Sequence, residues 1–176
     1  MNPALILLRI ALFTLLIAIG ANVELDLGPV PFILSDFFVL LAGLLLTWRS
    51  AAFSIGLYLL LGIMGLPIFA GGESGLTYFI GPTFGYLIGF GLAGIAVSRL
   101  AHVGKQRLLK DAAATLTGQA LIFALGVPWL RYRADLSWEI AFAKGFLPFL
   151  VPIVIKLITA VLLAQLLRKF ILFRPT

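Results

Sequence analysis

Three charged residues lie inside apolar stretches of the sequence, where an ionised group is costly to place. Lys144 and Lys156 belong to the apolar run over 141–167, and Asp36 belongs to the run over 32–48. A charge near mid-bilayer costs about 2.5–3.5 kcal/mol on insertion scales, so such a residue usually faces a cavity or a partner. Lys156 lies roughly 18 Å beyond Lys144 along a helix and is the deeper of the two. We therefore expect Lys156 to hold the anionic end of a ligand.

Each of these charges also has a simpler interpretation. Lys144, and less easily Lys156, could extend its long apolar stem to the membrane interface. Asp36 could be a counter-ion to either lysine, a ligand contact, or an N-terminal cap of the second apolar segment, and the sequence does not rank these three roles. Pro148 and Pro152 interrupt the backbone between the lysines and free carbonyl groups toward the interior.

A glycine-rich loop with embedded aromatic residues is the second candidate feature. It reads Gly65-Leu66-Pro67-Ile68-Phe69-Ala70-Gly71-Gly72-Glu73-Ser74-Gly75. Glycine permits positive φ and close approach of the backbone. Phe69, with Tyr78 and Phe79, could cover an apolar face of a ligand, whereas a flexible connector would be more polar. We therefore expect this loop to form an ordered lid.

The composition indicates which elements must position these residues. Hydrophobic residues make up 62% of the 176 residues and charged residues 11%, against about 45–50% and 25% in soluble domains. The net charge is +6, but no basic stripe alternates with exposed aromatics, so we expect no nucleic-acid partner. The sequence contains no Cys, which excludes disulfides, thiol catalysis and Cys-ligated metals. We expect an integral membrane protein in a lipid bilayer, with no metal and no cofactor.

Six stretches are apolar enough to be membrane spans of about 20 residues. They are 4–21, 32–48, 51–66, 77–98, 109–130 and 141–167. The second and third are short and adjoin segments rich in Pro and Gly, so we expect part of each crossing to be non-helical. The runs are too long for transmembrane strands and lack period-2 alternation. No repeat or linker divides the chain, which predicts one domain over 1–176, an all-α bundle of six transmembrane helices.

Charge separates the connections between these stretches into two sets. The termini and the second and fourth loops are basic, with Arg9, Arg49, Arg99, Lys105, Arg107, Lys110, Arg168, Lys169 and Arg174. The first, third and fifth loops carry Glu24, Asp26, Glu73, Asp135 and Glu139, with Arg131 and Arg133 as cations. The positive-inside rule then places both termini in the cytoplasm and the acidic loops outside.

The first stretch could instead be a signal peptide, cleaved after Ala18-Ile19-Gly20. Against this, Arg9 lies inside the apolar run, and the run exceeds the usual 7–15 residues. If this stretch were removed, the remaining basic loops would still share one side of the membrane, so the predicted orientation would not change.

Five strings, in this order, make the chain similar to the BioY family, the biotin-binding S components of energy-coupling factor (ECF) transporters. The resemblance runs from about residue 10 to residue 165. The strings are Pro29-Val30-Pro31-Phe32 leading into Phe38-Val39-Leu40-Leu41-Ala42-Gly43, Gly65-Leu66-Pro67-Ile68-Phe69-Ala70-Gly71-Gly72, Gly81-Pro82-Thr83-Phe84-Gly85-Tyr86-Leu87-Ile88-Gly89-Phe90, Leu125-Gly126-Val127-Pro128-Trp129-Leu130, and Gly145-Phe146-Leu147-Pro148-Phe149 with Lys156.

The resemblance implies a six-helix S component in a prokaryotic plasma membrane, whose outward-facing vitamin site is gated by the first and third loops. Such a protein is not an enzyme. It works with a transmembrane coupling protein and a pair of cytoplasmic ATPases, although some members are reported to work without a complete energizing module. Lys156 would face the biotin carboxylate or ring. Thr83, Tyr86 and the lid glycines Gly71 and Gly72 would lie around the pocket.

Several residues depart from the family pattern. Ile153 stands where the family usually has an aspartate, Ile33 and Ser35 where it has Thr and Gln, and Phe84 where it has Gly. An apolar residue in place of a hydrogen-bonding one would leave a ureido ring without a partner, at roughly 1–3 kcal/mol per bond. The small-residue face of the first helix, which the family uses to meet the coupling protein, is interrupted because Leu15 follows Ala11. The alternative ligand is therefore another carboxylate nutrient, such as lipoate.

Two further functions belong to other classes. An intramembrane enzyme would use Asp36 and Lys156 as an acid–base pair within hydrogen-bond reach. The chain lacks a second intramembrane carboxylate and the GxSxG, HExxH and phosphate-loop motifs, so we expect no catalytic residue. A structural membrane adaptor would have no enclosed cavity between its helices.

Overall fold

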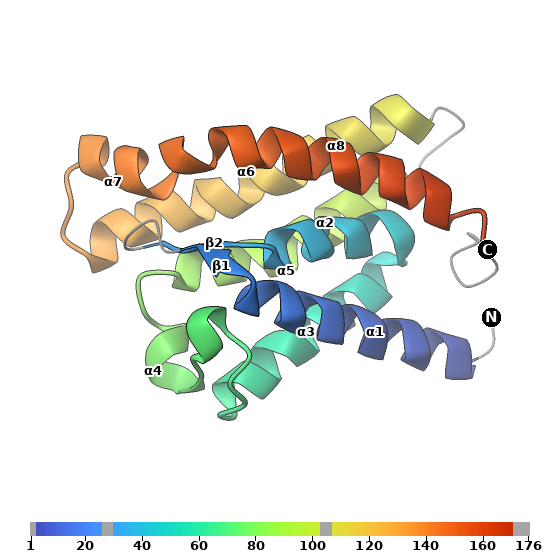
Figure 1. Ribbon diagram of the computed structural model, residues 1–176, viewed down its shortest axis with the longest axis horizontal. Coiled ribbons are helices and arrows are strands. Elements are labelled where there is room, and N and C mark those ends of the chain that lie inside the picture. Colours follow the sequence, from blue (N-terminus) through green and yellow to red (C-terminus); the bar gives the residue numbers. More distant parts are fainter. Residues whose placement is uncertain (1–2, 26–29, 103–106, 171–176) are drawn as a thin grey trace.

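The computed structural model describes residues 3–25, 30–102 and 107–170 of the chain. Asp26, Pro29, Lys105 and Arg174, which the sequence interpretation used, lie outside these described residues. The elements in chain order are α1 (Pro3–Asn22), β1 (Glu24–Leu25), β2 (Phe32–Ile33), α2 (Ser35–Leu45), α3 (Trp48–Ile63), η1 (Ala70–Gly72), α4 (Gly75–Phe79), α5 (Phe84–Ala101), α6 (Arg107–Arg133), α7 (Trp138–Gly145), η2 (Leu147–Phe149) and α8 (Leu150–Leu167). Figure 1 shows these helices packed side by side along the long axis of the molecule.

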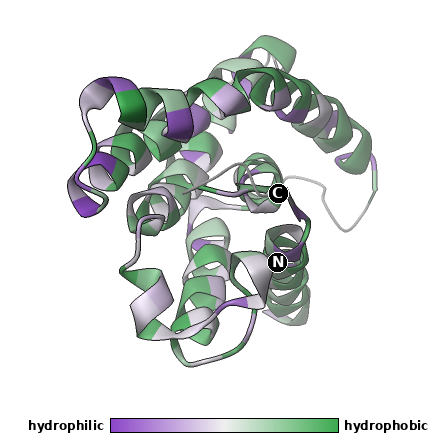
Figure 2. Ribbon diagram, turned by 60° about the vertical axis from the view of Figure 1, so that its left-hand side comes forward, coloured by the Kyte–Doolittle hydropathy of each residue, from purple (hydrophilic) through white to green (hydrophobic). Residues whose placement is uncertain are grey.

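The helices match the apolar stretches of the sequence and confirm the predicted all-α class. Four described helical segments are long and apolar enough to cross a membrane: α1, α5, α6 and the nearly continuous segment Trp138–Leu167. The helices α2 and α3 are shorter apolar elements. Figure 2 shows that the helices are predominantly hydrophobic along their lengths. The polypeptide therefore presents apolar surface outward, as a lipid-facing bundle does.

The second apolar stretch does not begin as a helix at residue 32, as the sequence predicts. Phe32 and Ile33 form β2, which pairs antiparallel with β1 in the register Glu24↔Ile33 and Leu25↔Phe32. The preceding Pro31 has no N–H to continue a helix. The helix α2 begins at Ser35, whose hydroxyl donates a 2.9 Å hydrogen bond to the Ile17 carbonyl of α1. Ser35 therefore ties the start of α2 to α1.

The fourth apolar stretch is also interrupted where the sequence predicts one helix over 77–98. The short helix α4 ends at Phe79, and α5 begins only at Phe84, after Gly81 and Pro82. The indole N–H of Trp129 on α6 donates a 2.9 Å hydrogen bond to the Gly81 carbonyl. This bond fixes the break between α4 and α5 against α6.

Glycine allows α5 and α6 to approach closely. A Cβ atom at Gly89 would lie 2.8 Å from the Cα atom of Ile122, and one at Gly85 would overlap the Leu125 carbonyl. Because these atoms belong to the backbone of α6, they cannot turn aside as a side chain could. The two helices therefore pack backbone to backbone beside the cavity described below.

Two ends of the bundle can be distinguished. In Figure 1, α1 begins and α8 ends at one end, together with the turn between α2 and α3; the hairpin, η1 and α4 lie at the other. Arg49, Arg99 and Arg168 lie in the first turn of α3, the last turn of α5 and the C-cap of α8. We call this the basic end, and the end formed by β1, β2, η1 and α4 the lid end.

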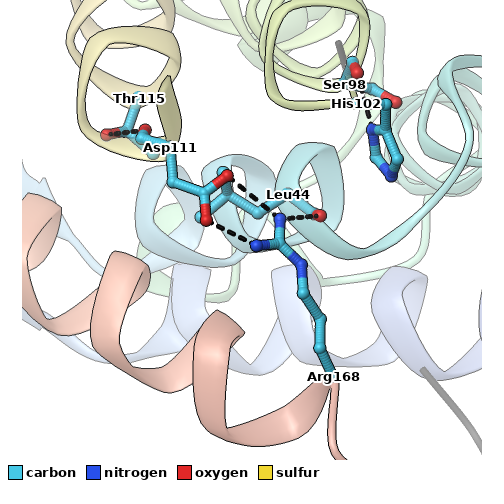
Figure 3. A network of polar contacts seen from close by, with 6 residues as sticks. All are labelled: Leu44, Ser98, His102, Asp111, Thr115 and Arg168. Atoms are coloured by element: carbon cyan, nitrogen blue, oxygen red, sulfur yellow. Dashed lines mark hydrogen bonds and ion pairs between the residues drawn. The ribbon is translucent and has the colours of Figure 1, made fainter. Parts of the chain in front are cut away.

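At the basic end, Arg168 joins three helices through one guanidinium group. Nη1 lies 2.5 Å from Asp111 Oδ2, Nη2 lies 3.1 Å from Asp111 Oδ1, and Nη2 also donates to the Leu44 carbonyl at 2.8 Å. Asp111 is completely buried. Figure 3 shows this two-pronged contact between α8, α6 and α2. Such a bidentate arginine–carboxylate pair fixes both distance and orientation.

Candidate functional site

The ammonium group of Lys156 is enclosed by three partners from the start of the second apolar segment. Its Nζ lies 2.7 Å from Asp36 Oδ1, donates to the Ile33 carbonyl at 2.6 Å, and lies 4.1 Å from the centroid of the Phe32 ring. Only 6% of Lys156 is exposed. The lysine therefore faces the interior of the bundle and does not extend to the membrane interface.

Lys144 differs from Lys156 in its surroundings. It lies in the last turn of α7, is exposed, and does not contribute to the cavity beside Lys156. The simpler interpretation, a lysine that reaches outward, fits its position.

Asp36 is the counter-ion of Lys156, one of the three roles that the sequence left open. It lies in the first turn of α2, whose N-cap is Leu34 without a side-chain cap, so the capping role is wrong. Asp36 Oδ1 contacts Lys156, and Oδ2 accepts a 3.4 Å hydrogen bond from Gln119 Nε2. Opposite charges in contact lower the cost of burying each.

Gln119 on α6 is a site residue that the sequence interpretation missed. It is 3% exposed, and its Oε1 has no hydrogen-bond partner among the described residues. A buried acceptor without a partner is uncommon and calls for an explanation. The available signal was a lone amide in the middle of the apolar stretch 109–130. A search restricted to charged residues passes over it.

These groups line a cavity of about 50 Å³ between the helices. Its remaining lining is mostly apolar or aromatic. The lining residues are Val30, Pro31, Ile33, Asp36, Tyr58, Ala70, Tyr78, Thr83, Tyr86, Leu87, Phe90, Gln119, Ile122, Phe123, Phe149 and Lys156. The volume suffices for a few water molecules but is below the roughly 300–1,000 Å³ of small-molecule sites. A larger ligand would therefore require the lining to move apart.

An outer hollow of about 380 Å³ lies next to this cavity at the lid end. It is lined by Pro31, Glu73, Ser74, Thr77, Tyr78, Gly81, Pro82 and Thr83. Pro31, Tyr78 and Thr83 line both spaces. These three residues therefore form the boundary between the outer hollow and the cavity.

The lid loop is anchored by Phe69, which is completely buried. Its ring meets Tyr58 edge-on at 5.6 Å and stacks on Tyr78 at 5.2 Å between centroids. Its N–H donates to the Glu73 carbonyl at 3.0 Å. Phe69 thus lies behind Tyr78 and does not line the cavity in this conformation.

Gly71 and Gly72 have φ values of +70° and +72°, as the glycine-rich sequence led us to expect. They lie against the chain near the lid-end hairpin: a Cβ at Gly71 would come 3.1 Å from Glu24 Oε1, and one at Gly72 would come 3.9 Å from Asn22 Oδ1. Neither glycine lines the cavity. Their observed role is to shape the lid backbone.

Thr83 and Tyr86 do line the cavity. Thr83 is the residue before α5, at the boundary with the outer hollow. The Tyr86 hydroxyl donates a 2.9 Å hydrogen bond to the Gly145 carbonyl, and its ring meets Phe123 edge-on at 5.8 Å. Tyr86 therefore joins α5 to the end of α7 across the cavity wall.

The geometry of the cavity can be compared with the two alternative functions, an intramembrane enzyme and a structural membrane adaptor. Asp36 and Lys156 satisfy the distance that an acid–base pair needs, but Asp36 is the only carboxylate that lines the cavity among the described residues. No group of three or more His, Asp or Glu residues in the described part of the chain could hold a metal ion. The cavity between the helices, in turn, is a feature that the adaptor interpretation does not predict.

Comparison with known proteins gives a consistent result. The family model described as "BioY family" matches residues 3–172. A protein of Pyrococcus horikoshii named "Probable biotin transporter BioY" is 40% identical over 156 residues, which cover 89% of this chain and 91% of the relative. A "Biotin transporter BioY" of Thermotoga maritima is 40% identical over 163 residues, covering 93% and 95%. A crystal structure described as the S-component for biotin from an ECF-type ABC transporter superposes with a TM-score of 0.87 at 27% identity, covering 96% of this chain and 95% of that one.

Proposed function

Because the chain belongs to the BioY family, we propose that it is the substrate-binding S component of an ECF-type transporter and that its ligand is biotin. It is a multi-pass membrane protein and not an enzyme. The observation that carries the choice of ligand is the hydrogen-bonding set at the inner end of the cavity. That set consists of Lys156, Asp36 and Gln119.

The charges of this set argue for a neutral polar group of the ligand. Lys156 is already paired with Asp36 at 2.7 Å, so the pair carries no net charge. A ligand carboxylate placed there would add an uncompensated negative charge beside Asp36, which is costly away from water. The sequence prediction that Lys156 neutralises a ligand carboxylate is therefore replaced by a proposal for the other end of the molecule.

The ureido ring of biotin offers two N–H donors and one carbonyl acceptor. The Lys156 ammonium can donate to that carbonyl, while Asp36 and the unpartnered Oε1 of Gln119 can accept from the two N–H groups. The proposal thus gives the buried acceptor a partner and leaves no ureido group unpaired. The dithiolane ring of lipoate has no N–H group, so lipoate would leave the Oε1 acceptor of Gln119 unsatisfied. This difference favours biotin over the lipoate alternative.

The rest of the ligand fits the remaining lining. The rings of Tyr58, Tyr86, Phe123 and Phe149 would cover the sulfur-containing ring and the aliphatic chain. The carboxylate would then extend toward the outer hollow, where Ser74, Thr77 and Thr83 offer hydroxyl donors. Admission of biotin requires Tyr78 and the lid to move outward, because the cavity of about 50 Å³ is too small for it.

The proposed topology has six crossings, with both termini in the cytoplasm and the lid end outside. The four long apolar helices, the two shorter ones and the cations of the basic end support this arrangement. The chain lacks a nucleotide-binding motif, so the proposed uptake needs a transmembrane coupling protein and paired cytoplasmic ATPases. The cytoplasmic basic end would lie on their side.

Ligand binding to the detergent-purified protein tests the proposal. Biotin and biotinamide, which share the ureido ring but differ at the carboxylate, are expected to bind with affinities within about tenfold of each other, while lipoate binds at least 100-fold more weakly. Tight lipoate binding together with loss of biotinamide binding would instead assign Lys156 to the carboxylate. Absence of biotin binding would reject the proposed ligand.

A further inference from the structure

The outer hollow at the lid end is larger than the cavity beneath it. Its volume of about 380 Å³ lies within the range of roughly 300–1,000 Å³ for small-molecule sites. In the proposed function, only the carboxylate at the end of the biotin chain reaches this hollow. A carboxylate alone does not fill it, because a single water molecule takes up about 30 Å³ of the liquid. The hollow therefore has room for a group attached beyond the carboxyl carbon.

The charge at this hollow is negative. Among the described residues that line it, Glu73 alone is charged. Neither of the two ion pairs found in the described part of the chain involves Glu73. Three cations lie at the same end of the bundle as the hollow, on the last turns of α6 and α7 (Figure 1), but none of them lines the hollow or the cavity: Arg131, Arg133 and Lys144. A ligand anion in the hollow would thus meet a carboxylate and no cation.

The backbone of the lid fixes the position of Glu73. Its carbonyl accepts a 3.0 Å hydrogen bond from the N–H of the completely buried Phe69, and its own N–H donates to the Ala70 carbonyl at 3.3 Å. Glu73 itself is exposed. A second carboxylate lies close by, because a Cβ atom at Gly71 would come 3.1 Å from Glu24 Oε1. Both carboxylates repel a ligand anion at the lid end and attract a ligand cation.

We propose that the chain also binds biotin amides that end in an ammonium group, with this group in the outer hollow beside Glu73. The inference rests on the proposed function, because it requires the ureido ring to occupy the inner end of the cavity. Formation of the amide removes the carboxylate that Glu73 repels, and the ammonium group adds an attraction to the same side chain. The hydroxyl groups of Ser74, Thr77 and Thr83 remain available to the amide group.

Two amides of equal size separate the effect of charge from that of length. Biotin joined to ethylenediamine ends in an ammonium group, whereas biotin joined to propylamine ends in a methyl group at the same distance. Isothermal titration calorimetry of the protein in an uncharged detergent measures both affinities. At low ionic strength the ethylenediamine amide should bind roughly threefold to tenfold more tightly, a modest factor because Glu73 is exposed. The preference should decrease as salt is added, because salt screens exposed charges.

Glu73→Gln should abolish the preference for the ethylenediamine amide and leave the affinity of the propylamine amide almost unchanged. Glu139→Gln provides the matched control, because Glu139 is an exposed carboxylate in the first turn of α7 that does not line the hollow. This variant should keep the full preference. Thermal unfolding establishes that both variants remain folded.

Three results would overturn this inference while biotin still binds. The first is equal affinity of the two amides for the unaltered protein, and the second is an undiminished preference in Glu73→Gln. The third is failure of both amides to bind, because the hollow would then have no room beyond the carboxyl carbon. Absence of biotin binding would instead reject the proposed function, and this inference with it.

Discussion

The ammonium of Lys156 on α8 and the carboxylate of Asp36 on α2 form an ion pair of 2.7 Å whose two side chains are almost fully buried. The Ile33 carbonyl adds a third polar atom to the pair, at 2.6 Å from the lysine Nζ. The pair joins two helices at the inner wall of the cavity. Its net charge is zero, which decides what kind of ligand group it can accept.

The first prediction concerns the coupling between these two charges. Lys156→Met and Asp36→Asn should each destabilise the protein by about 3–5 kcal/mol, because each leaves the opposite charge buried without its partner. The double substitution should cost clearly less than the sum of the two. Thermal and denaturant unfolding in detergent measure these differences.

Lys144→Met is the matched control, because Lys144 is an exposed lysine at the end of α7. It should change the free energy of unfolding by less than about 0.5 kcal/mol. Additive effects of Lys156→Met and Asp36→Asn would show that the two groups do not stabilise each other.

The second prediction separates ligand recognition from folding at Gln119. Gln119→Met keeps the length of the side chain but removes the acceptor that we assign to a ureido N–H. Biotin affinity should fall roughly tenfold to 100-fold, corresponding to about 1–3 kcal/mol, while the apoprotein should lose at most about 1 kcal/mol, because the bond that Nε2 donates to Asp36 is long, at 3.4 Å. Isothermal titration calorimetry and thermal unfolding measure the two quantities separately.

Gln165→Met, at a partly buried position on α8 outside the cavity lining, should leave biotin affinity unchanged. Undiminished biotin affinity in Gln119→Met would remove Gln119 from the proposed site.

The third prediction tests the anchoring of the lid. A Cβ atom at Gly62 would overlap the ring of Phe69, which has no free space because it packs against Tyr58 and Tyr78. Gly62→Ala should therefore displace Phe69, loosen the lid and increase the rate of biotin dissociation. Gly56→Ala lies on the same helix, and its Cβ atom would meet nothing within 4 Å.

Stopped-flow displacement of labelled biotin measures the dissociation rate for both variants. Biotin should dissociate from Gly56→Ala at the unchanged rate. This variant should also be slightly more stable, because alanine has a higher helix propensity than glycine. Equal dissociation rates for Gly62→Ala and Gly56→Ala would contradict the role of Phe69 as the anchor of the lid.

The fourth prediction concerns the clamp at the basic end. Arg168→Gln removes the partner of the completely buried Asp111 and should cost about 3–5 kcal/mol of stability. The neighbouring Lys169→Gln, at an exposed position, should have almost no effect. Thermal unfolding distinguishes the two variants. A stability of Arg168→Gln equal to that of Lys169→Gln would show that the clamp is energetically unimportant.

Much of the architecture could be predicted because the bilayer limits it so strongly. Apolar runs of about 20 residues give helices in a membrane, and the runs around α1, α5, α6 and α8 were long enough to be unambiguous. The ends of the runs were less certain. Pro31 and Gly81-Pro82 shift the start of α2 to Ser35 and separate α4 from α5, although the hydrophobicity continues through both places.

The site was predictable where a charge marked it and obscure where it depended on packing. Lys156 was identified because an ammonium in an apolar run needs a partner, but the choice of Asp36 required the three-dimensional contact. Gln119 carries no charge and gave a weak signal. Phe69 was expected at the ligand, yet the same apolar character allows it to serve as core beneath the lid.

The Arg168 clamp has a mechanical consequence for the biotin site. Because one guanidinium fastens α8 to α6 and α2 at the basic end, a tilt of α8 would pivot there. Lys156 lies roughly 18 Å from that pivot along α8, so a rotation of about 5° would displace it by roughly 1.6 Å. Such a displacement exceeds the tolerance of a 2.7 Å hydrogen bond. A small tilt of α8 about this pivot would thus be enough to separate Lys156 from Asp36.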